Sequence, residues 1–275
     1  MSQGVRRHVF APPALDLSMP TSWGKDFDYS ILGVTAHRPW PMPDSAWIMT
    51  QTWRHLLFAH WPVSADMLRE RMPVRFDLDR FDGQAWLGVV PFEMSNVAPR
   101  GVPALPGLSR FPELNVRTYV SVKGVPGVYF FSLDAGNALV ATMARLLFHL
   151  PYFPADMELD AGGDSVSYRS RRRAAMASTG TFVAHYRATG PEYEAAPGSL
   201  EYFLTERYCL FTTARSGSAL RVDIHHPPWR LRIAAAEFEV NTMAAASGLQ
   251  LPDVEPLLHV ASRQDVVAWA PRVQP

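Results

Sequence analysis

Cysteine and lysine are almost missing from this sequence. The single cysteine, Cys209, excludes an internal disulfide and any zinc site built from several cysteines. Of the 26 basic residues only Lys25 and Lys123 are lysines, and all the others are arginines. A mechanism that needs a lysine amine therefore has two candidates.

Long apolar runs and an excess of one charge are missing too. No stretch approaches the roughly 20 apolar residues of a membrane span, and the first residues lack the continuous apolar core of a secretory signal. Lys+Arg and Asp+Glu are equal in number, so the net charge is zero, whereas proteins that bind nucleic-acid backbones usually show a basic excess. We expect a cytoplasmic protein that binds neither membranes nor nucleic acid.

The common cofactor and metal motifs are also absent. There is no GxGxxG, P-loop, HExxH or GxSxG sequence. The nine histidines are scattered, and the adjacent pair His225 and His226 would point to opposite faces of a strand. No cofactor and no metal is expected.

What is present is a pattern of many strands and few helices. Residues 1–40, broken by proline and glycine, predict an extended and partly disordered arm, and 41–275 a single β-rich domain around a pocket. Capping and apolar spacing predict helices at 65–72, 137–150 and from Ser199. Alternation predicts strands at 84–92, 115–122, 128–134, 165–174, 180–188, 207–213, 219–226, 230–241 and 266–269. The fold class is α+β, mainly antiparallel β, with a curved sheet or barrel and a few flanking helices.

One strand carries a row of polar side chains. With a period of two, Glu113, Asn115, Arg117 and Tyr119 share one face, and apolar residues share the other. The polar row faces either solvent or an internal cavity. A buried glutamate and arginine would be costly unless paired, and such groups suit the anchoring and polarisation of a carboxylate or carbonyl.

Three other clusters are weaker candidates. Arg169, Arg171 and Arg173 predict a solvated edge strand that discourages aggregation. Asp223 shares a face with His225, which would make His225 a general base with an acidic partner, although a structural histidine is the commoner case. Glu206 shares a face with Tyr208 and is a candidate ligand contact. Glu237 and Glu239 are either acid–base groups or an exposed strand face.

Several long segments resemble the YqjF-like family of bacterial proteins. They include HRPWPMPDSAWIMTQTWRHLLFAHWPV, FDGQAWLGVVPFEMS, LPGLSRFPELNVRTYV, PGVYFFSLDAGN, LLFHLPYF, APGSLEYFLTERYCLF, IHHPPW and EVNTMA, and the resemblance runs from about Arg38 to Trp269. That family is more distantly similar to the acetoacetate decarboxylase-like superfamily. The resemblance implies a cone-like antiparallel barrel that encloses a polar pocket.

The resemblance also shows a departure. In the decarboxylase a lysine forms a Schiff base with the keto acid, and Glu113 matches an active-site glutamate of that enzyme. Where two lysines would follow the helix, this chain has Tyr152 and Phe153 after Pro151. Decarboxylation through an imine is therefore not expected. Tyr152 and Phe153 either fill the pocket or leave it open, with Tyr152 as a hydrogen-bond donor.

Two main hypotheses follow. The first is an enzyme for a small oxo or hydroxy acid or a polyketide-like carbonyl compound, with Glu113 as acid or base, Arg117 as anchor and Tyr152 as proton donor; His225 is a weaker catalytic candidate. Asn115, Tyr119 and Glu206 are candidate binding residues. The second is a non-catalytic binding or sensing module with the same pocket. A structural protein with a filled pocket is a third class. Homo-oligomerisation stays open, because relatives of the decarboxylase often assemble.

Overall fold

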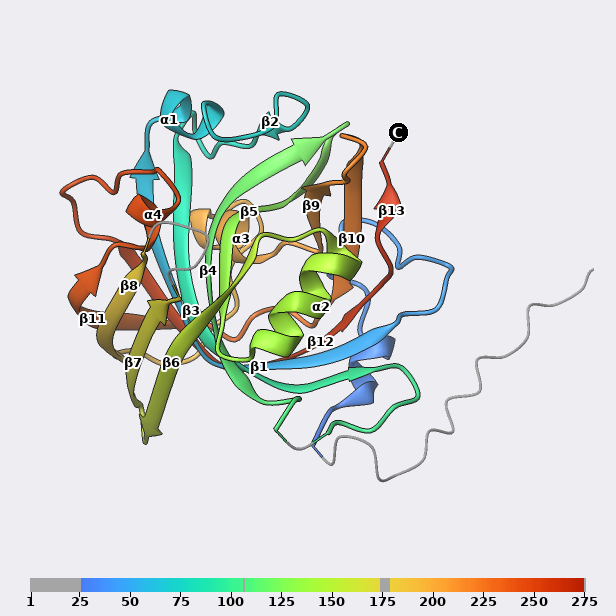
Figure 1. Cartoon of the computed structure of the whole chain (residues 1–275), viewed down its shortest axis with the longest axis horizontal. Coiled ribbons are helices and arrows are strands. Elements are labelled where there is room, and N and C mark those ends of the chain that lie inside the picture. Colours follow the sequence, from blue (N-terminus) through green and yellow to red (C-terminus); the bar gives the residue numbers. More distant parts are fainter. Residues whose placement is uncertain (1–25, 106, 174–178, 275) are drawn as a thin grey trace, which may run out of the picture.

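The computed structural model describes residues 26–105, 107–173 and 179–274 (Figure 1). Its long strands are β1 (Met49–Val63), β3 (Ala85–Pro99), β4 (Phe111–Val122), β5 (Val125–Ala135), β6 (Tyr152–Gly162), β7 (Ser165–Arg172), β8 (Thr181–Ala188), β11 (Arg232–Asn241) and β12 (Leu257–Ala268). Shorter strands are β2 (Asp77–Leu78), β9 (Cys209–Thr213), β10 (Ala219–His225) and β13 (Arg272–Val273). The helices are η1 (Tyr29–Gly33), α1 (Ala65–Arg69), α2 (Ala138–Phe148), α3 (Leu200–Thr205) and α4 (Met243–Ala246).

The sheet closes on itself in a ring-like arrangement. β5 pairs with β4, β6 and β9, and β12 pairs with β1, β10 and β11. Two closed circuits therefore share β4, β3 and β1: one returns through β9 and β10, the other through β6, β7, β8 and β11. Among the strands of the described residues, only the pairings of β5 with β6 and with β9 are parallel. The mainly antiparallel, curved sheet with few helices agrees with the expected fold class.

The shared strands β1 and β3 are buried on both faces over their middle parts, which explains the apolar runs there. Neighbours on β1 enter different cores: Leu57 packs in one and Phe58 in the other. A strand covered on both sides has a continuous apolar run instead of alternation. For this reason alternation did not predict β1, and the strand predicted at 84–92 covers only the first half of β3.

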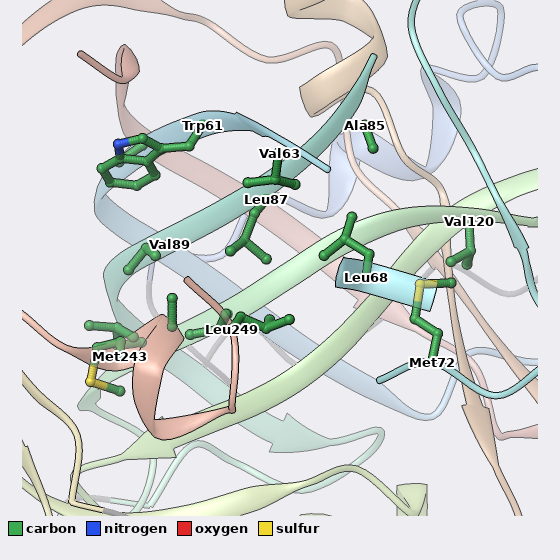
Figure 2. Packing of buried hydrophobic residues seen from close by; sticks show 14 of the residues in the cluster. Trp61, Val63, Leu68, Met72, Ala85, Leu87, Val89, Val120, Met243 and Leu249 are labelled. Carbon is green, nitrogen blue, oxygen red and sulfur yellow. The ribbon is translucent and has the colours of Figure 1, made fainter. Parts of the chain in front are cut away.

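The first core lies in the larger circuit, under α1 and α4. Figure 2 shows Leu87 and Val89 of β3 close to Leu68 of α1 and to Met243 of α4. The second core lies in the smaller circuit and includes Phe92, Leu133 and Phe148. Helix α2 packs against β5 and β6 beside it and lies across the middle of the view in Figure 1.

The expected position of the arginine-rich strand is corrected. The arginine-rich strand β7 is not an edge, because it pairs with both β6 and β8. Arg169 and Arg171 are exposed as expected, but Arg172 is buried and forms an ion pair with Asp134 at 2.7 Å. Strand β6 and most of β12 were not predicted, because their polar residues hide the alternation.

Helix α2 differs from its predicted core-facing stripe. Leu139, Leu146 and Leu147 are each 57% exposed, and the buried residues are Ala141 and Phe148. The helix is apolar nearly all round, so sequence periodicity could not tell which side faces inward.

Part of the predicted N-terminal arm packs onto the sheet. Phe27 and Ile31 are buried against Val267 and Trp269, and η1 begins at Tyr29. The first part of the arm, including Lys25, lies outside the described residues. Among the described segments, no helix has the length and apolar character needed to cross a membrane.

Candidate functional site

An internal cavity of about 170 Å³ lies in the smaller circuit of strands, beneath α2. Glu113, Asn115 and Arg117 line it from alternate positions of β4. On α2, the lining residues include Val140, Met143 and Leu147. The polar row of β4 therefore faces a hollow and not bulk water.

Glu113 is the acidic group of this cavity. Its side chain is 2% exposed, and its Oε2 accepts a hydrogen bond from the Tyr152 hydroxyl at 3.0 Å. Burial raises the pKa of Glu113 to about 8, and the charge of Asp134 adds to the rise, while the bond from Tyr152 opposes it. Glu113 is therefore largely protonated at neutral pH, and both of its forms are accessible just above it.

The chain reaches this geometry through a tight exit from α2. Asn137 caps the start of α2 by accepting from two backbone N–H groups, and His149 ends it with a left-handed backbone at φ 53°. Tyr152 then pairs in parallel with Leu133 of β5, whose other neighbour is Asn115 of β4. The tyrosine ring is thus directed at the polar row of β4.

Arg117 has no carboxylate partner in the part of the chain that is described. Its Nη2 donates to the Leu204 carbonyl at 3.3 Å and to the Tyr119 hydroxyl at 3.4 Å, and its buried Nε has no partner. The guanidinium lies over the Phe58 ring, with 5.1 Å to its centroid. A buried cation without a counter-ion is unfavourable unless an anion binds beside it.

A buried network holds Arg117 in place. The Tyr119 hydroxyl donates to the Leu204 carbonyl at 2.7 Å, so the contact with His60 Nε2 at 2.6 Å requires the histidine to donate. Burial and the Arg117 charge lower the pKa of His60 well below its usual value, so the ring is neutral. Gly88 makes room for this network, since a Cβ there would lie 3.0 Å from His60. Tyr119 thus supports Arg117 and does not itself line the cavity.

Aromatic rings form a further wall of the cavity. Trp53 stacks on Trp229 with 5.8 Å between centroids and meets Phe92 edge-on at 5.9 Å. All three line the cavity, and the indole N–H of Trp229 is buried without a partner. The space is therefore mostly apolar, with a few polar groups that converge on it, as in ordinary small-molecule sites.

Glu206 and His225, two predicted site residues, do not line the cavity. Glu206 accepts from the Tyr208 hydroxyl and from the Trp229 backbone N–H, and burial raises its pKa. His225 contacts Arg38 and the Ile31 carbonyl, and burial lowers its pKa to about 4.

Asp223, the expected orienting partner of His225, instead pairs with Arg221 and Arg272. Alternation held in β10, where Val222 and Ile224 line the cavity and Asp223 does not, so the inward face is the other one. Glu206 lies outside a strand, because it follows α3 and β9 begins only at Cys209.

Two residues that were not predicted as site residues line the cavity instead, and each is the chain neighbour of a predicted one. Arg207 lines the cavity next to Glu206, and His226 lines it next to His225. Arg207 is paired with Asp79 at 2.7 Å, which leaves Arg117 as the free anion site of the two. Alternation separates the two faces in the sequence but does not mark which of them turns inward.

Other candidate centres are absent from the described residues. No group of three histidine, cysteine or acidic side chains there could hold a metal ion. Lys123 lies in the turn between β4 and β5, and no lysine lines the cavity in these segments. Glu237 and Glu239 are exposed on β11, where Glu239 pairs with His185.

Comparison with known proteins agrees with this architecture. The model of the DUF2071 family, described as an uncharacterized conserved protein, matches residues 50–265. Over 228 residues the chain is 49% identical to the uncharacterized protein YqjF of Bacillus subtilis, covering 83% of this chain and 93% of the relative.

Solved structures with the same fold are enzymes of low sequence identity. An acetoacetate decarboxylase-like enzyme from Sphingomonas wittichii has a TM-score of 0.56 at 13% identity, over 86% of this chain and 98% of the other. Acetoacetate decarboxylase from Legionella pneumophila has a TM-score of 0.52 at 14% identity, with coverage of 91% and 97%. The enduracididine biosynthesis enzyme MppR, complexed with pyruvate, has a TM-score of 0.55 at 10% identity, with coverage of 86% and 93%.

Proposed function

Because the chain belongs to the DUF2071 family and has the fold of acetoacetate decarboxylase-like enzymes, we propose that it is a lysine-independent enzyme that moves protons on a carbonyl compound. Its substrate is a small oxo or hydroxy acid or a polyketide-like carbonyl compound. The reaction is an enolisation, a hydration or dehydration, or a cyclisation, and it involves no Schiff base.

One observation carries this proposal. A buried carboxyl group and a buried guanidinium without a carboxylate partner line the same cavity. The pKa of Glu113, raised to about 8, is close to physiological pH, where a general acid–base group is most effective. Arg117 offers a site for the carboxylate of the substrate.

The proton balance can be written for enolisation and for hydration, and dehydration is the reverse of the latter. The neutral carboxyl of Glu113 donates a proton to the oxygen of the substrate as electron density shifts onto that oxygen. The resulting carboxylate then takes a proton from the neighbouring carbon, in enolisation, or from water, in hydration. Tyr152 keeps the carboxyl oriented through its hydrogen bond to Oε2.

The fold neighbours give indirect support for the substrate class. MppR is known in complex with pyruvate, a small oxo acid. The acetoacetate decarboxylases act, by their name, on a keto acid. The shared fold can thus enclose such acids, although each chemistry depends on the residues of its own site.

Isotope exchange tests the reaction without knowledge of the substrate. Oxo acids are incubated with the protein in D₂O and in ¹⁸O-water, because enolisation exchanges hydrogen beside the carbonyl and hydration exchanges its oxygen. We expect exchange to be faster with the wild type than in buffer alone. The rate of exchange should fall by about 100-fold or more in Glu113→Gln, with binding of the acid little changed. Glu237→Gln, on the exposed face of β11, is the matched control.

Binding without exchange in any acid would instead support the alternative, a non-catalytic binding or sensing module. The imine route is tested separately by borohydride treatment in the presence of keto acids. A labelled lysine would contradict the lysine-independent mechanism.

A further inference from the structure

The polar groups of the cavity are held at separate places along β4. Strand β4 pairs with β3 without interruption from Phe111 to Thr118, and the register shift in its pairing with β5, between Val116 and Arg117, places the extra residue on β5, so β4 itself is extended. On such a strand the backbones of Glu113 and Arg117 lie about 13 Å apart. Asn115 lies between them, and its buried Oδ1 has no partner in the described structure.

The side-chain contacts keep these two groups apart. Arg117 is bonded to Tyr119 and Leu204, and Tyr119 is two residues farther from Glu113 along β4. Glu113 is held instead by Tyr152 of β6. A ligand that uses both groups must therefore present two oxygen functions at some distance from each other.

The wall opposite this polar row is apolar. The α2 side chains that line the cavity include Val140, Met143 and Leu147, and none of the α2 lining residues is polar. The part of the ligand between its two oxygen functions therefore contacts hydrocarbon and is best a carbon chain.

The cavity volume limits the length of that chain. A dry cavity of about 150 Å³ holds one benzene molecule, or about six non-hydrogen atoms. By the same ratio the present cavity of about 170 Å³ holds about seven non-hydrogen atoms, so an acid with eight or nine displaces the apolar side chains of α2 slightly.

From these observations, and on the basis of the proposed function, we infer that the substrate carries its carboxylate and its reacting carbonyl apart, as in a 4-oxo or 5-oxo acid. The carboxylate binds at Arg117 and the carbonyl at Glu113. In a 2-oxo acid such as pyruvate the two groups are on adjacent carbons, so it reaches one end of the polar row and leaves the other unused.

Calorimetric titration with a graded series tests this inference. The series is pyruvate, acetoacetate, 4-oxopentanoate and 5-oxohexanoate, with hexanoate as the acid that lacks a carbonyl. We expect a 4-oxo or 5-oxo acid to bind about tenfold or more tighter than both pyruvate and hexanoate. Both Arg117→Gln and Glu113→Leu, which removes the hydrogen-bond donor that the glutamine variant keeps, should weaken the binding of the oxo acid, whereas only Arg117→Gln should weaken the binding of hexanoate. Arg171→Gln, exposed on β7, is the control for the lost charge.

The outcomes separate this inference from the proposed function. Equal or tighter binding of pyruvate, with isotope exchange that depends on Glu113, would overturn the spacing and leave the enzyme proposal intact. If only one of the substitutions at Arg117 and Glu113 weakens the binding of the 4-oxo and 5-oxo acids, the inferred spacing is overturned as well. If no acid binds to the wild type at any spacing, both the inference and the proposed function fail.

Discussion

Replacement of Glu113 by glutamine should stabilise the protein, increasingly so as the pH rises. Burial raises the pKa of this carboxyl from 4.5 to about 8. The folded protein therefore keeps a proton that the unfolded chain has lost between these values. Stability then falls as the pH rises through this window, and the loss is complete above the folded pKa. Glutamine has the same shape, can still accept from Tyr152, and has no proton to take up.

The magnitude follows from the size of the window. Each pH unit corresponds to about 1.4 kcal/mol. The free energy of unfolding of Glu113→Gln should exceed that of the wild type by about 3 kcal/mol at neutral pH and by about 5 kcal/mol above pH 8, with little difference near pH 4.5. These are upper values, because water that enters the cavity would reduce the cost of the charge.

Urea unfolding of both proteins at several pH values from about 5 to about 9 measures this difference. The buried histidines change the stability of both proteins in the same way, so they cancel when the two are subtracted. A difference that stays constant with pH would refute the buried, protonated carboxyl. Glu237→Gln should leave the pH dependence unchanged, since its side chain is exposed on β11.

Three other substitutions probe the surroundings of the site. Arg117→Met should leave the ligand-free protein as stable or more stable, because it removes a buried cation without a counter-ion, yet lower carboxylate affinity about tenfold or more in titration calorimetry; a clear loss of stability would contradict this. Asp134→Asn should lower the free energy of unfolding in urea by about 3–5 kcal/mol, because Arg172 would keep a buried charge without its partner. A decrease of less than about 1 kcal/mol would refute this expectation. Gly88→Ala places a Cβ 3.0 Å from His60 and 3.3 Å from Arg117. It should therefore lower the free energy of unfolding by about 1–3 kcal/mol and weaken carboxylate binding. Unchanged stability and unchanged binding would show that the His60 and Arg117 side chains can move aside.

The polar row of β4 shows how far the sequence could lead. Period-two alternation correctly grouped Glu113, Asn115 and Arg117 on one face, because successive side chains of a strand always alternate. Alternation does not tell whether such a face meets water or a cavity. That was decided by closure of the ring through β9 and β10, together with α2 above it.

The segments of Glu206 and His225 show the limit more clearly. Alternation was correct in β10 but not before β9, where Glu206 follows a helix, and the tertiary structure turned Arg207 and His226 toward the cavity. Either parity of a strand satisfies the local backbone equally well. Only the packing of β9 and β10 against their neighbours made one of them the inner face.

Residue identity and the fixed geometry of a strand were enough to predict the strand-rich fold class and the alternating polar row, and they made the scarcity of lysine plain. The tertiary structure alone decided that Tyr152 meets Glu113, that Arg117 is left without a carboxylate, and that the space between them stays open. These features depend on contacts between residues far apart in the chain, and so does the degree of burial that sets the protonation of Glu113.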